Sequence, residues 1–516
     1  MLIGVWERLP PRVNHFQKKS HESLKTVTNI PSELLEFVRR DTYSLLIKGY
    51  AGTGKTTLSL TILRTLKIRH NFFYISTRLS PRQLFLHYQW LGRYVDATPD
   101  QKESSSSRQP SSYDISSFED ARLDEPESLF ERITNQLMDV KAPVIIIDSW
   151  DAIASFMDKE ARLNNERVLQ TWRERAGAKL IFISEDPADP TLDFLVDGIV
   201  QLNNKLYGDV KVREIVLAKL RGIRIRKSSY VFTLDNALFQ SYNPYDPAEF
   251  MPADSHENDY DTDKRGDLRR KPMAPLTKSL ANIDFVPSGY SQLDESFGGG
   301  FPKKSVVLIE SDSNVHAGVT MTLLANMIAN VTKIGNPVII EPFMTIDAIT
   351  IMKYLKPYLQ TGFKKDLIRI FRSDRPRNAE AVSLDDASSQ KDNASISRKH
   401  VRYYCEFVLK TRQKYPHRLL LTIVSAEMFR TTYHLREGNT VDLLSFLNVN
   451  SDLTLIPASS SYCEELNLSE MANLNLRLST INGTLILRSI SPETCPFAIV
   501  TQGYPGPPSV RLEPLV

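Results

Sequence analysis

The fold is decided by the stretch from Tyr43 to Lys67, YSLLIK-GYAGTGKT-TLSLTILRTLK. Its first six residues form a short apolar run that stops at a glycine, which predicts a buried strand. Its last eleven residues, Thr57–Lys67, carry leucine and isoleucine at helical spacing, which predicts a helix. A glycine-rich loop of the form GxxxxGK[ST] between such a strand and helix predicts a phosphate-binding loop. The alternative is a simple glycine-rich turn before a helix, which would not need an apolar strand in front of it.

The loop residues have separate predicted tasks. Backbone N–H groups would surround the phosphates, the Lys55 ammonium would reach the β- and γ-phosphates, and the Thr56 hydroxyl would bind magnesium. The following helix would point the positive end of its dipole at the anion. We therefore predict that ATP with Mg²⁺ is bound here and that Lys55 is also catalytic. The predicted cofactor-binding residues are Gly49, Tyr50, Ala51, Gly52, Thr53, Gly54, Lys55, Thr56 and Thr57.

A second acidic element is expected on a later strand. The run VIIID at 144–148 is a hydrophobic strand that ends in Asp148, as a magnesium-holding strand requires. The predicted metal residues are therefore Thr56 and Asp148. The alternative is that Asp148 only caps the next turn. Asp151 is interpreted as an N-cap or loop residue.

The first half of the chain alternates strands and helices. Further strands are predicted at 71–76, 142–148, 179–184 and 197–202, with helical stretches between them. This alternation predicts an α/β, doubly wound and mainly parallel sheet.

Three polar segments, at 98–124, 246–281 and 373–397, interrupt the periodic pattern. They cannot bury enough apolar surface to offset their ordering entropy, so they are expected to be insertions or linkers. The middle segment is the best domain boundary. It leaves residues 1–245 as the P-loop domain and residues 282–516 as a second domain of similar size.

Several motifs of the first half resemble RecA-type ATPases of the KaiC branch. They are the P-loop, IIIDSWDAI at 145–153, LIFISEDP at 180–187 and VLAKLRG at 216–222. Two more segments, IPSELLEF at 30–37 and YISTRLSPRQLF at 74–85, look like the gas-vesicle regulatory GvpD family within that branch.

The resemblance implies that Lys219 and Arg221 approach the γ-phosphate of a neighbouring subunit, and therefore a homo-oligomer. The alternative is a solvated basic strand edge that continues through Arg224, Arg226 and Lys227.

One departure from the family concerns hydrolysis. A glutamate that polarises water is usual just after the strand that follows the P-loop helix, but this chain has Ser76-Thr77-Arg78 there. Glu185 is a candidate substitute, although a structural or sensor role suits it better. We therefore expect slow hydrolysis or binding with little turnover.

The second half opens like a KaiC domain at 286–310 but lacks the phosphate loop. The corresponding segment 311–320 keeps only Gly318 and Thr320, and Val319 replaces the lysine. The later strand 419–425 has Val424 and Ser425 in place of a magnesium aspartate. We predict a degenerate RecA-like domain that ends in a hairpin at 473–489.

The composition excludes some classes of protein. The net charge is +3, from 64 basic and 61 acidic residues, which argues against a surface that coats nucleic acid. Three widely spaced cysteines favour a reducing compartment, and no apolar run is long enough to span a membrane. A cytoplasmic location is expected.

Three functions remain open at this level. The first is a nucleotide-dependent regulator of a protein partner, such as a transcriptional activator. The second is a DNA-associated RecA paralogue that uses the basic runs at 219–227 or 264–271. The third is a structural oligomer held together by ATP.

Overall fold

A computed structural model describes residues 30–96, 118–122, 126–137, 140–252, 284–359, 365–371, 390–502 (without 432, 434 and 436) and 509–516. Most of the three predicted polar segments lies outside these residues. Two described parts of them are helical, since η3 (Pro247–Phe250) lies in the middle segment and α11 (Gln390–Lys414) begins in the last. Phe250 is buried in the core of the second domain. The domain boundaries remain predictions.

The first domain is built on a nine-stranded sheet in the order β3-β2-β4-β5-β1-β6-β7-β8-β9. The strands from β3 to β6 are parallel, and β6 to β9 continue as antiparallel hairpins. The strands are β1 (Tyr43–Lys48), β2 (Phe72–Ser76), β3 (Phe118–Asp120), β4 (Val144–Asp148), β5 (Lys179–Ser184), β6 (Gly198–Tyr207), β7 (Val210–Leu220), β8 (Ser229–Thr233) and β9 (Gln240–Ser241). The helices are α1 (Ser32–Val38), α2 (Lys55–Thr65), α3 (Pro81–His87), α4 (Gln89–Asp96), α5 (Pro126–Leu137), α6 (Trp150–Ala154) and α7 (Lys159–Ala176), with a 3-10 turn η2 (Asp235–Ala237).

Helices cover both faces of this sheet. Leu45 and Ile47 of β1 belong to the same buried cluster as the apolar side chains of α2, whereas Leu46 belongs to the cluster of Trp150 and Trp172 on the opposite face. Both faces are buried because successive strand residues point to opposite sides. This explains why β1 is apolar almost throughout.

The second domain repeats the same topology. Its nine-stranded sheet has the order β14-β13-β15-β16-β12-β17-β18-β19-β20, which is the order of the first sheet when strands are counted from β12. Its strands are β12 (Ser305–Ser311), β13 (Val338–Ile340), β14 (Ile368–Ile370), β15 (Leu421–Ile423), β16 (Leu453–Ser459), β17 (Leu474–Ile481), β18 (Thr484–Ser491), β19 (Phe497–Gln502) and β20 (Ser509–Pro514), and β10 (Phe285–Val286) pairs with β11 (Phe301–Pro302) beside it. The other elements are α8 (Ser291–Ser296), α9 (Ala317–Lys333), α10 (Ala348–Leu359), η5 (Lys365–Leu367), α12 (Ala426–Thr431), α13 (Glu437–Asn450), α14 (Ser460–Glu465) and α15 (Leu468–Met471).

The predicted fold class is thus confirmed: α/β, with two tandem, mostly parallel RecA/KaiC-like domains. The predicted C-terminal hairpin is also present. Asn482 and Gly483 both have positive φ, at 48° and 73°, and they join β17 to β18. An Asn-Gly pair is the usual solution for a two-residue hairpin turn, because both central residues need this backbone region.

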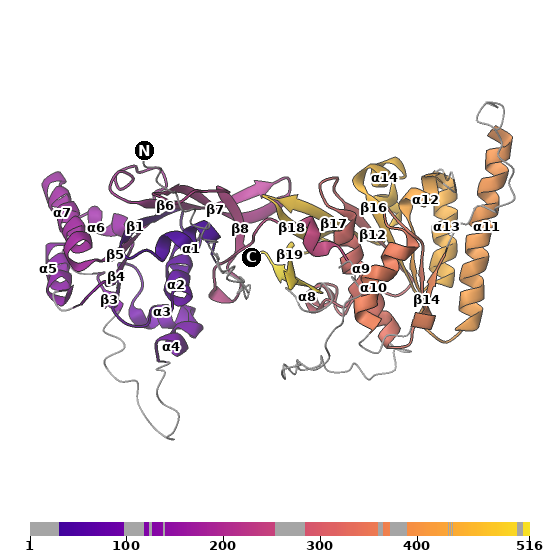
Figure 1. The fold of residues 1–516 in the computed structure, drawn as a ribbon, viewed down its shortest axis with the longest axis horizontal. Coiled ribbons are helices and arrows are strands. Elements are labelled where there is room, and N and C mark those ends of the chain that lie inside the picture. The colour runs from indigo at the N-terminus through magenta and orange to yellow at the C-terminus, as the bar shows by residue number, and fades with distance from the viewer. Residues whose placement is uncertain are drawn as a thin grey trace, which may run out of the picture.

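The two domains meet through their antiparallel strands, in the middle of the molecule (Figure 1). One buried cluster contains Val212 and Val231 of the first domain together with Ile486 and Ala498 of the second. The hairpin tip continues this contact, since Tyr245 N–H donates to the Gly483 carbonyl at 2.9 Å. The second domain is therefore packed on the same strands that extend the nucleotide-binding sheet.

Candidate nucleotide site and its link to the second domain

The loop from Gly49 to Thr56 joins β1 to α2 in a conformation that depends on glycine. Gly54 has a φ of 98°, and a Cβ there would lie 2.7 Å from the side chain of Leu234. At Gly49 a Cβ would lie 2.5 Å from the carbonyl oxygen of Leu202. The loop can therefore approach β6 and the residue that follows β8 only because these positions have no side chain.

Lys55 lies in the centre of this loop. Its Nζ donates to the carbonyl oxygens of Gly49 and Tyr50, at 2.7 and 2.8 Å, and the residue is buried. Burial lowers the pKa of Lys55, while the nearby carboxylates of Glu185 and Asp148 act in the opposite direction. The ammonium is thus held where a phosphate would need a cation.

Thr56 and Asp148 are brought together as a magnesium site would require. The Thr56 hydroxyl donates to Oδ2 of Asp148 at 2.7 Å, and the Tyr74 hydroxyl donates to the same oxygen at 2.6 Å. Within the described ranges, no group of three or more His, Cys, Asp or Glu residues could hold a metal by itself. The Thr56–Asp148 pair suits Mg²⁺, which keeps several waters and binds through one or two protein oxygens plus phosphates. Thr56 and Asp148 would hold it, and the ion would offset phosphate charge.

Arg78 lies in the segment 76–78, where the resemblance leads us to expect a glutamate, and it forms an ion pair with Glu185. Glu185 follows β5, and its backbone N–H donates to Asp151. Asp151 also accepts from the Ser184 hydroxyl at 3.1 Å. It lies in the first turn of α6, whose N-cap is Ser149, so the interpretation of Asp151 as an N-cap or loop residue is wrong. Its carboxylate instead fixes the end of β5 beside the loop.

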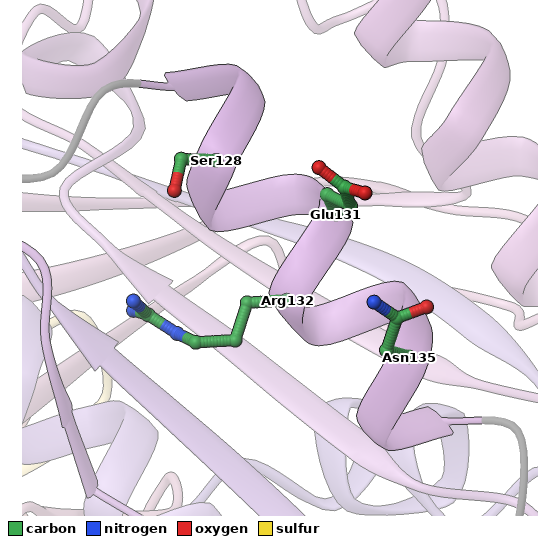
Figure 2. A pocket seen from close by; sticks show the side chains of 4 residues that line it. All are labelled: Ser128, Glu131, Arg132 and Asn135. Carbon is green, nitrogen blue, oxygen red and sulfur yellow. The ribbon is translucent and has the colours of Figure 1, made fainter.

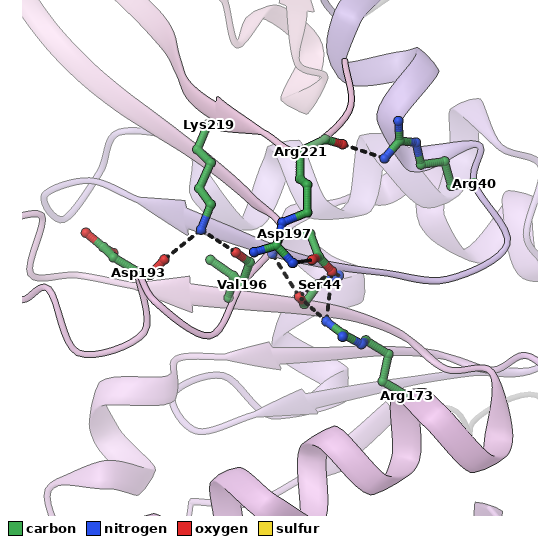
Figure 3. A network of polar contacts seen from close by, with 8 residues as sticks. All are labelled: Arg40, Ser44, Arg173, Asp193, Val196, Asp197, Lys219 and Arg221. Atoms are coloured by element: carbon green, nitrogen blue, oxygen red, sulfur yellow. Dashed lines mark hydrogen bonds and ion pairs between the residues drawn. The ribbon is translucent and has the colours of Figure 1, made fainter.

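Lys219 and Arg221 contact the segment that joins β5 to β6 in the same chain (Figure 3). Nζ of Lys219 donates to the carbonyl oxygens of Asp193 and Val196, at 2.9 and 2.7 Å. Nη1 of Arg221 lies 2.9 Å from Oδ1 of Asp197, a carboxylate also bonded by Ser44 and Arg173. A role at the phosphate of a neighbouring subunit remains a prediction for both side chains.

The basic run beyond Arg221 is partly used inside the chain. Nζ of Lys227 donates to the carbonyl of Asn482 in the second domain and lies 5.1 Å from the ring centre of Tyr230. The backbone N–H of Arg226 donates to Glu33. Lys227 is therefore an interdomain contact, which weakens the interpretation of this run as a DNA-binding strip.

The corresponding loop of the second domain is held by contacts of its own side chains. Asp312 accepts from Nε of Arg477 at 3.0 Å, and His316 caps α9 by accepting from the Gly318 N–H at 3.0 Å. Val319 takes the place of the lysine and is buried. An acidic side chain and a buried valine do not suit a polyphosphate.

Arg213 of β7 contacts both the phosphate loop and the residues that follow β20. Its Nη1 donates to the carbonyl oxygen of Gly52 at 3.0 Å, and its Nε donates to the backbone oxygen of Val516 at 2.9 Å. The Thr233 hydroxyl donates to the Pro514 carbonyl at 2.8 Å beside it. One guanidinium group thus joins the phosphate loop to Val516, two residues after β20.

A shallow hollow of about 500 Å³ lies along α5 (Figure 2). Its four lining side chains, Ser128, Glu131, Arg132 and Asn135, all come from this helix. They do not include any of the predicted site residues, so the hollow has no part in the nucleotide site.

Comparison with known proteins agrees with this geometry. The family model for the ATPase KaiC matches residues 37–242. Protein GvpD2 of Halobacterium salinarum is 21% identical over 490 residues, which cover 92% of this chain and 93% of that protein. The first domain is therefore similar to the ATPase KaiC family, and most of the chain is similar to protein GvpD2.

Two further relatives of this branch match about half of the chain. Protein GvpD1 of Halobacterium salinarum is 28% identical over 54% of this chain and 50% of its own length. The circadian clock oscillator protein KaiC of Parathermosynechococcus lividus is 26% identical over 51% of this chain and 45% of its own length. The chain thus spans about half the length of these two proteins. Among the described residues of this KaiC/GvpD-like chain, no helix is long and apolar enough to cross a membrane.

Sequence reasoning missed two side chains of the site. Tyr74 is one of several aromatic residues in an apolar strand, and Arg213 is one of many cations in a hairpin. A polar hydroxyl in the otherwise apolar β2 was the available signal for Tyr74, since a buried hydroxyl needs a partner. No local signal distinguishes Arg213.

Proposed function

We propose that this protein is an ATP- and Mg²⁺-binding regulator with slow hydrolysis, whose nucleotide state controls a protein partner such as a transcriptional activator. Its P-loop domain would bind the nucleotide through the residues from Gly49 to Thr57, with magnesium at Thr56 and Asp148. The second domain, which has no phosphate loop, would report the nucleotide state to the partner.

The observation that carries this proposal is the position of Arg213 between Gly52 and Val516. The N–H groups of the loop would turn toward the phosphates, so the Gly52 carbonyl opposite them is the group that the rest of the molecule can sense. A guanidinium that also holds Val516, just after β20, would convert a change in the loop into a change at the edge of the second domain. A nucleotide-controlled switch requires contacts that differ between the nucleotide-bound and the nucleotide-free state.

Slow turnover is supported by the groups around Lys55. Residues 76–78 include no carboxylate, and Glu185 is engaged by Arg78. A general base needs to reach the attacking water in its ionised, available form. A paired Glu185 meets this need poorly, so bound ATP would persist long enough to act as a signal.

The proposal includes a homo-oligomer, in which Lys219 and Arg221 would contribute to the site of a neighbouring subunit. Lys219 lies on β7, the strand that also carries Arg213, and Arg221 directly follows that strand. Release of their contacts with Asp193, Val196 and Asp197 would free two cations for a phosphate in trans. Positive charge supplied in this way stabilises the developing charge of phosphoryl transfer.

The test is co-purification from native cells with the wild-type protein and with Lys55→Ala. We expect one or more proteins to be retained in a manner that depends on ATP by the wild type only. Binding of ATP and oligomer mass are measured on the same samples. A partner that binds both proteins equally, with and without ATP, would contradict the regulatory proposal. An oligomer that forms only with ATP and retains no partner would favour the structural alternative.

A further inference from the structure

A second cavity lies on the first domain, at the opposite end of α2 from the phosphate loop. Its volume is about 640 Å³, within the range of small-molecule sites. Arg64 of α2 lies nine residues after Lys55, which places it roughly 13 Å further along the helix axis. The residues that line the cavity include Arg64, Gln89, Trp90, Arg93, Tyr94 and Asn236.

Arg64 has a nitrogen atom that calls for an acceptor. Its Nη1 is buried, and in the described part of the chain it has no hydrogen-bond partner. The guanidinium lies 5.0 Å from the ring centre of Trp90, so it is held in place by stacking. A buried donor without a partner is costly, and a planar guanidinium is suited to phosphate or carboxylate oxygens.

The aromatic walls of the cavity are fixed in position. Nε1 of Trp90 donates to the Ala237 carbonyl at 2.9 Å, and the Tyr94 hydroxyl lies 2.8 Å from the carbonyl oxygens of Leu63 and Ile68. The Trp90 and Tyr94 rings meet edge to face, with centroids 6.2 Å apart. Aromatic walls that are already ordered can stack on a planar ligand at little entropic cost.

The charged side chains that line the cavity, Arg64 and Arg93, are both basic. Residues 42–95 contain eight Lys or Arg and no Asp or Glu, although acidic and basic residues are nearly balanced in the whole chain. Arg93 is exposed at the cavity, and Arg69 lies 5.6 Å from the Tyr94 ring centre. The acid next to the lining residue Asn236 is Asp235, which accepts from the Asn236 amide at 2.7 Å. The cavity therefore favours an anionic ligand.

We propose that this cavity binds a nucleotide unit of single-stranded nucleic acid or a free nucleotide, with the base against Trp90 and the phosphate on Arg64 and Arg93. Cations interleaved with aromatic faces are the chemistry that recognises a phosphate next to a base. An acidic peptide would satisfy the cations but would make no stacking contact of its own with the two aromatic walls. This site is separate from the P-loop and does not depend on the regulatory proposal.

Binding is tested in the Lys55→Ala protein, so that the P-loop does not contribute. The probes are a fluorescent single-stranded oligodeoxythymidylate, free TMP and inorganic phosphate, with Trp90 emission as a second readout. We expect the oligonucleotide or TMP to bind and quench emission, and Arg93→Glu and Arg64→Gln each to weaken binding about tenfold, in line with the loss of one phosphate or stacking contact. The control Lys410→Glu changes the charge equally at an exposed site of α11 and should leave binding within about twofold of its starting value.

The relative affinities for the oligonucleotide and for TMP show whether the bound nucleotide belongs to a strand or is free. Binding of the oligonucleotide well above that of TMP, with a steep salt dependence, identifies a nucleic-acid strand, and equal binding identifies a free nucleotide. The proposal is overturned if neither ligand binds, if inorganic phosphate or a polyglutamate peptide competes equally well, or if Arg93→Glu and Lys410→Glu weaken binding alike. Trp90→Phe should abolish the quenching while leaving the phosphate contacts in place.

Discussion

Arg213 and Gly52 are 161 residues apart in sequence, yet Nη1 of Arg213 donates to the Gly52 carbonyl at 3.0 Å. The same guanidinium donates through Nε to the backbone oxygen of Val516, 303 residues away. Two bonds from one planar group join the phosphate loop to Val516, two residues after β20. The two bonds come from different nitrogens of the guanidinium, whereas lysine has one nitrogen in a different position, so Arg213→Lys cannot reproduce this pair of bonds.

Arg213→Lys should therefore separate nucleotide binding from the response of the second domain. The charge is kept, so we expect the affinity for ATP to change by less than about threefold, since contacts outside the binding groups rarely cost more than about 0.5 kcal/mol. ATP-dependent protection of residues 509–516 from hydrogen exchange should be lost. Lys211→Ala, an exposed change on the same strand, is the control. If ATP still protects residues 509–516 in Arg213→Lys, the contacts of Arg213 with Gly52 and Val516 do not carry the response of the second domain.

The Arg78–Glu185 ion pair predicts a hydrolysis phenotype. Arg78→Gln frees a carboxylate whose charge already acts on Lys55, so we expect the turnover of ATP to rise, by about tenfold, at the low end of what a positioned base supplies. Adding Glu185→Gln should return the rate to the wild-type level or below. Turnover is measured as phosphate release under saturating ATP and magnesium. The exposed Arg82→Gln is the control, and a rise in this variant or in the double variant would rule out Glu185 as the base.

The sequence predicted the parts of the site that follow from local pattern. The bounds of β1 and β5 are as expected, and the phosphate loop and the Asn482-Gly483 turn lie where their residues predict. These features are decided by neighbours within a few positions. The contacts of Arg213 and the pairing of Arg78 with Glu185 depend on which strands lie side by side, and that order comes from the whole sheet. The matching strand order of the two domains likewise became visible only in the structure, because the second loop has lost the residues that mark it.

The hairpin tip of the second domain provides a test of the domain contact. Nδ2 of Asn482 lies 2.6 Å from Oε1 of Glu214, a side chain that is only 2% exposed, and 2.9 Å from the Ser229 hydroxyl. Burial raises the pKa of Glu214, but the bonds from Lys205, Ser229 and Asn482 outweigh it and hold the pKa below its usual value. Glu214 is therefore ionised and needs its donors.

Asn482→Asp should open the contact between the domains. Aspartate accepts the left-handed backbone of the turn, so the change places a carboxylate against Glu214 without altering the hairpin. Loss of a buried, charge-assisted bond costs about 2–5 kcal/mol. We expect faster limited proteolysis between the domains and a larger radius of gyration in solution. Asn482→Gly keeps the turn and removes only the amide, so its effect should be smaller. Equal effects of the two changes would show that loss of the amide donor, and not the added carboxylate, opens the contact.

A buried glutamate in the second domain makes stability depend on pH. Glu341 follows β13 and has no exposed surface, and it accepts bonds from the Tyr433 hydroxyl and the Ser425 N–H. Burial raises the pKa of Glu341 from 4.5 to about 7, against the opposing effect of these two bonds. Its folded-state pKa lies above its unfolded-state pKa, so the stability that depends on the protonated form is full below about pH 4.5 and is lost as the pH rises through about 7.

Glu341→Gln should remove this dependence. The glutamine carbonyl can accept from the Ser425 N–H, and its amide can donate to the Tyr433 oxygen, as the protonated acid would. Between about pH 5 and pH 8 the free energy of unfolding of the variant should therefore rise relative to that of the wild type. The difference should reach up to about 3 kcal/mol, at roughly 1.4 kcal/mol per pK unit. Thermal unfolding of the second domain across this range measures the gain. Glu470→Gln removes the same charge from an exposed site and should give a difference that does not vary with pH. If the two variants show the same pH profile, Glu341 is already ionised in its buried site, and the donors of Tyr433 and Ser425 are then enough to stabilise its charge.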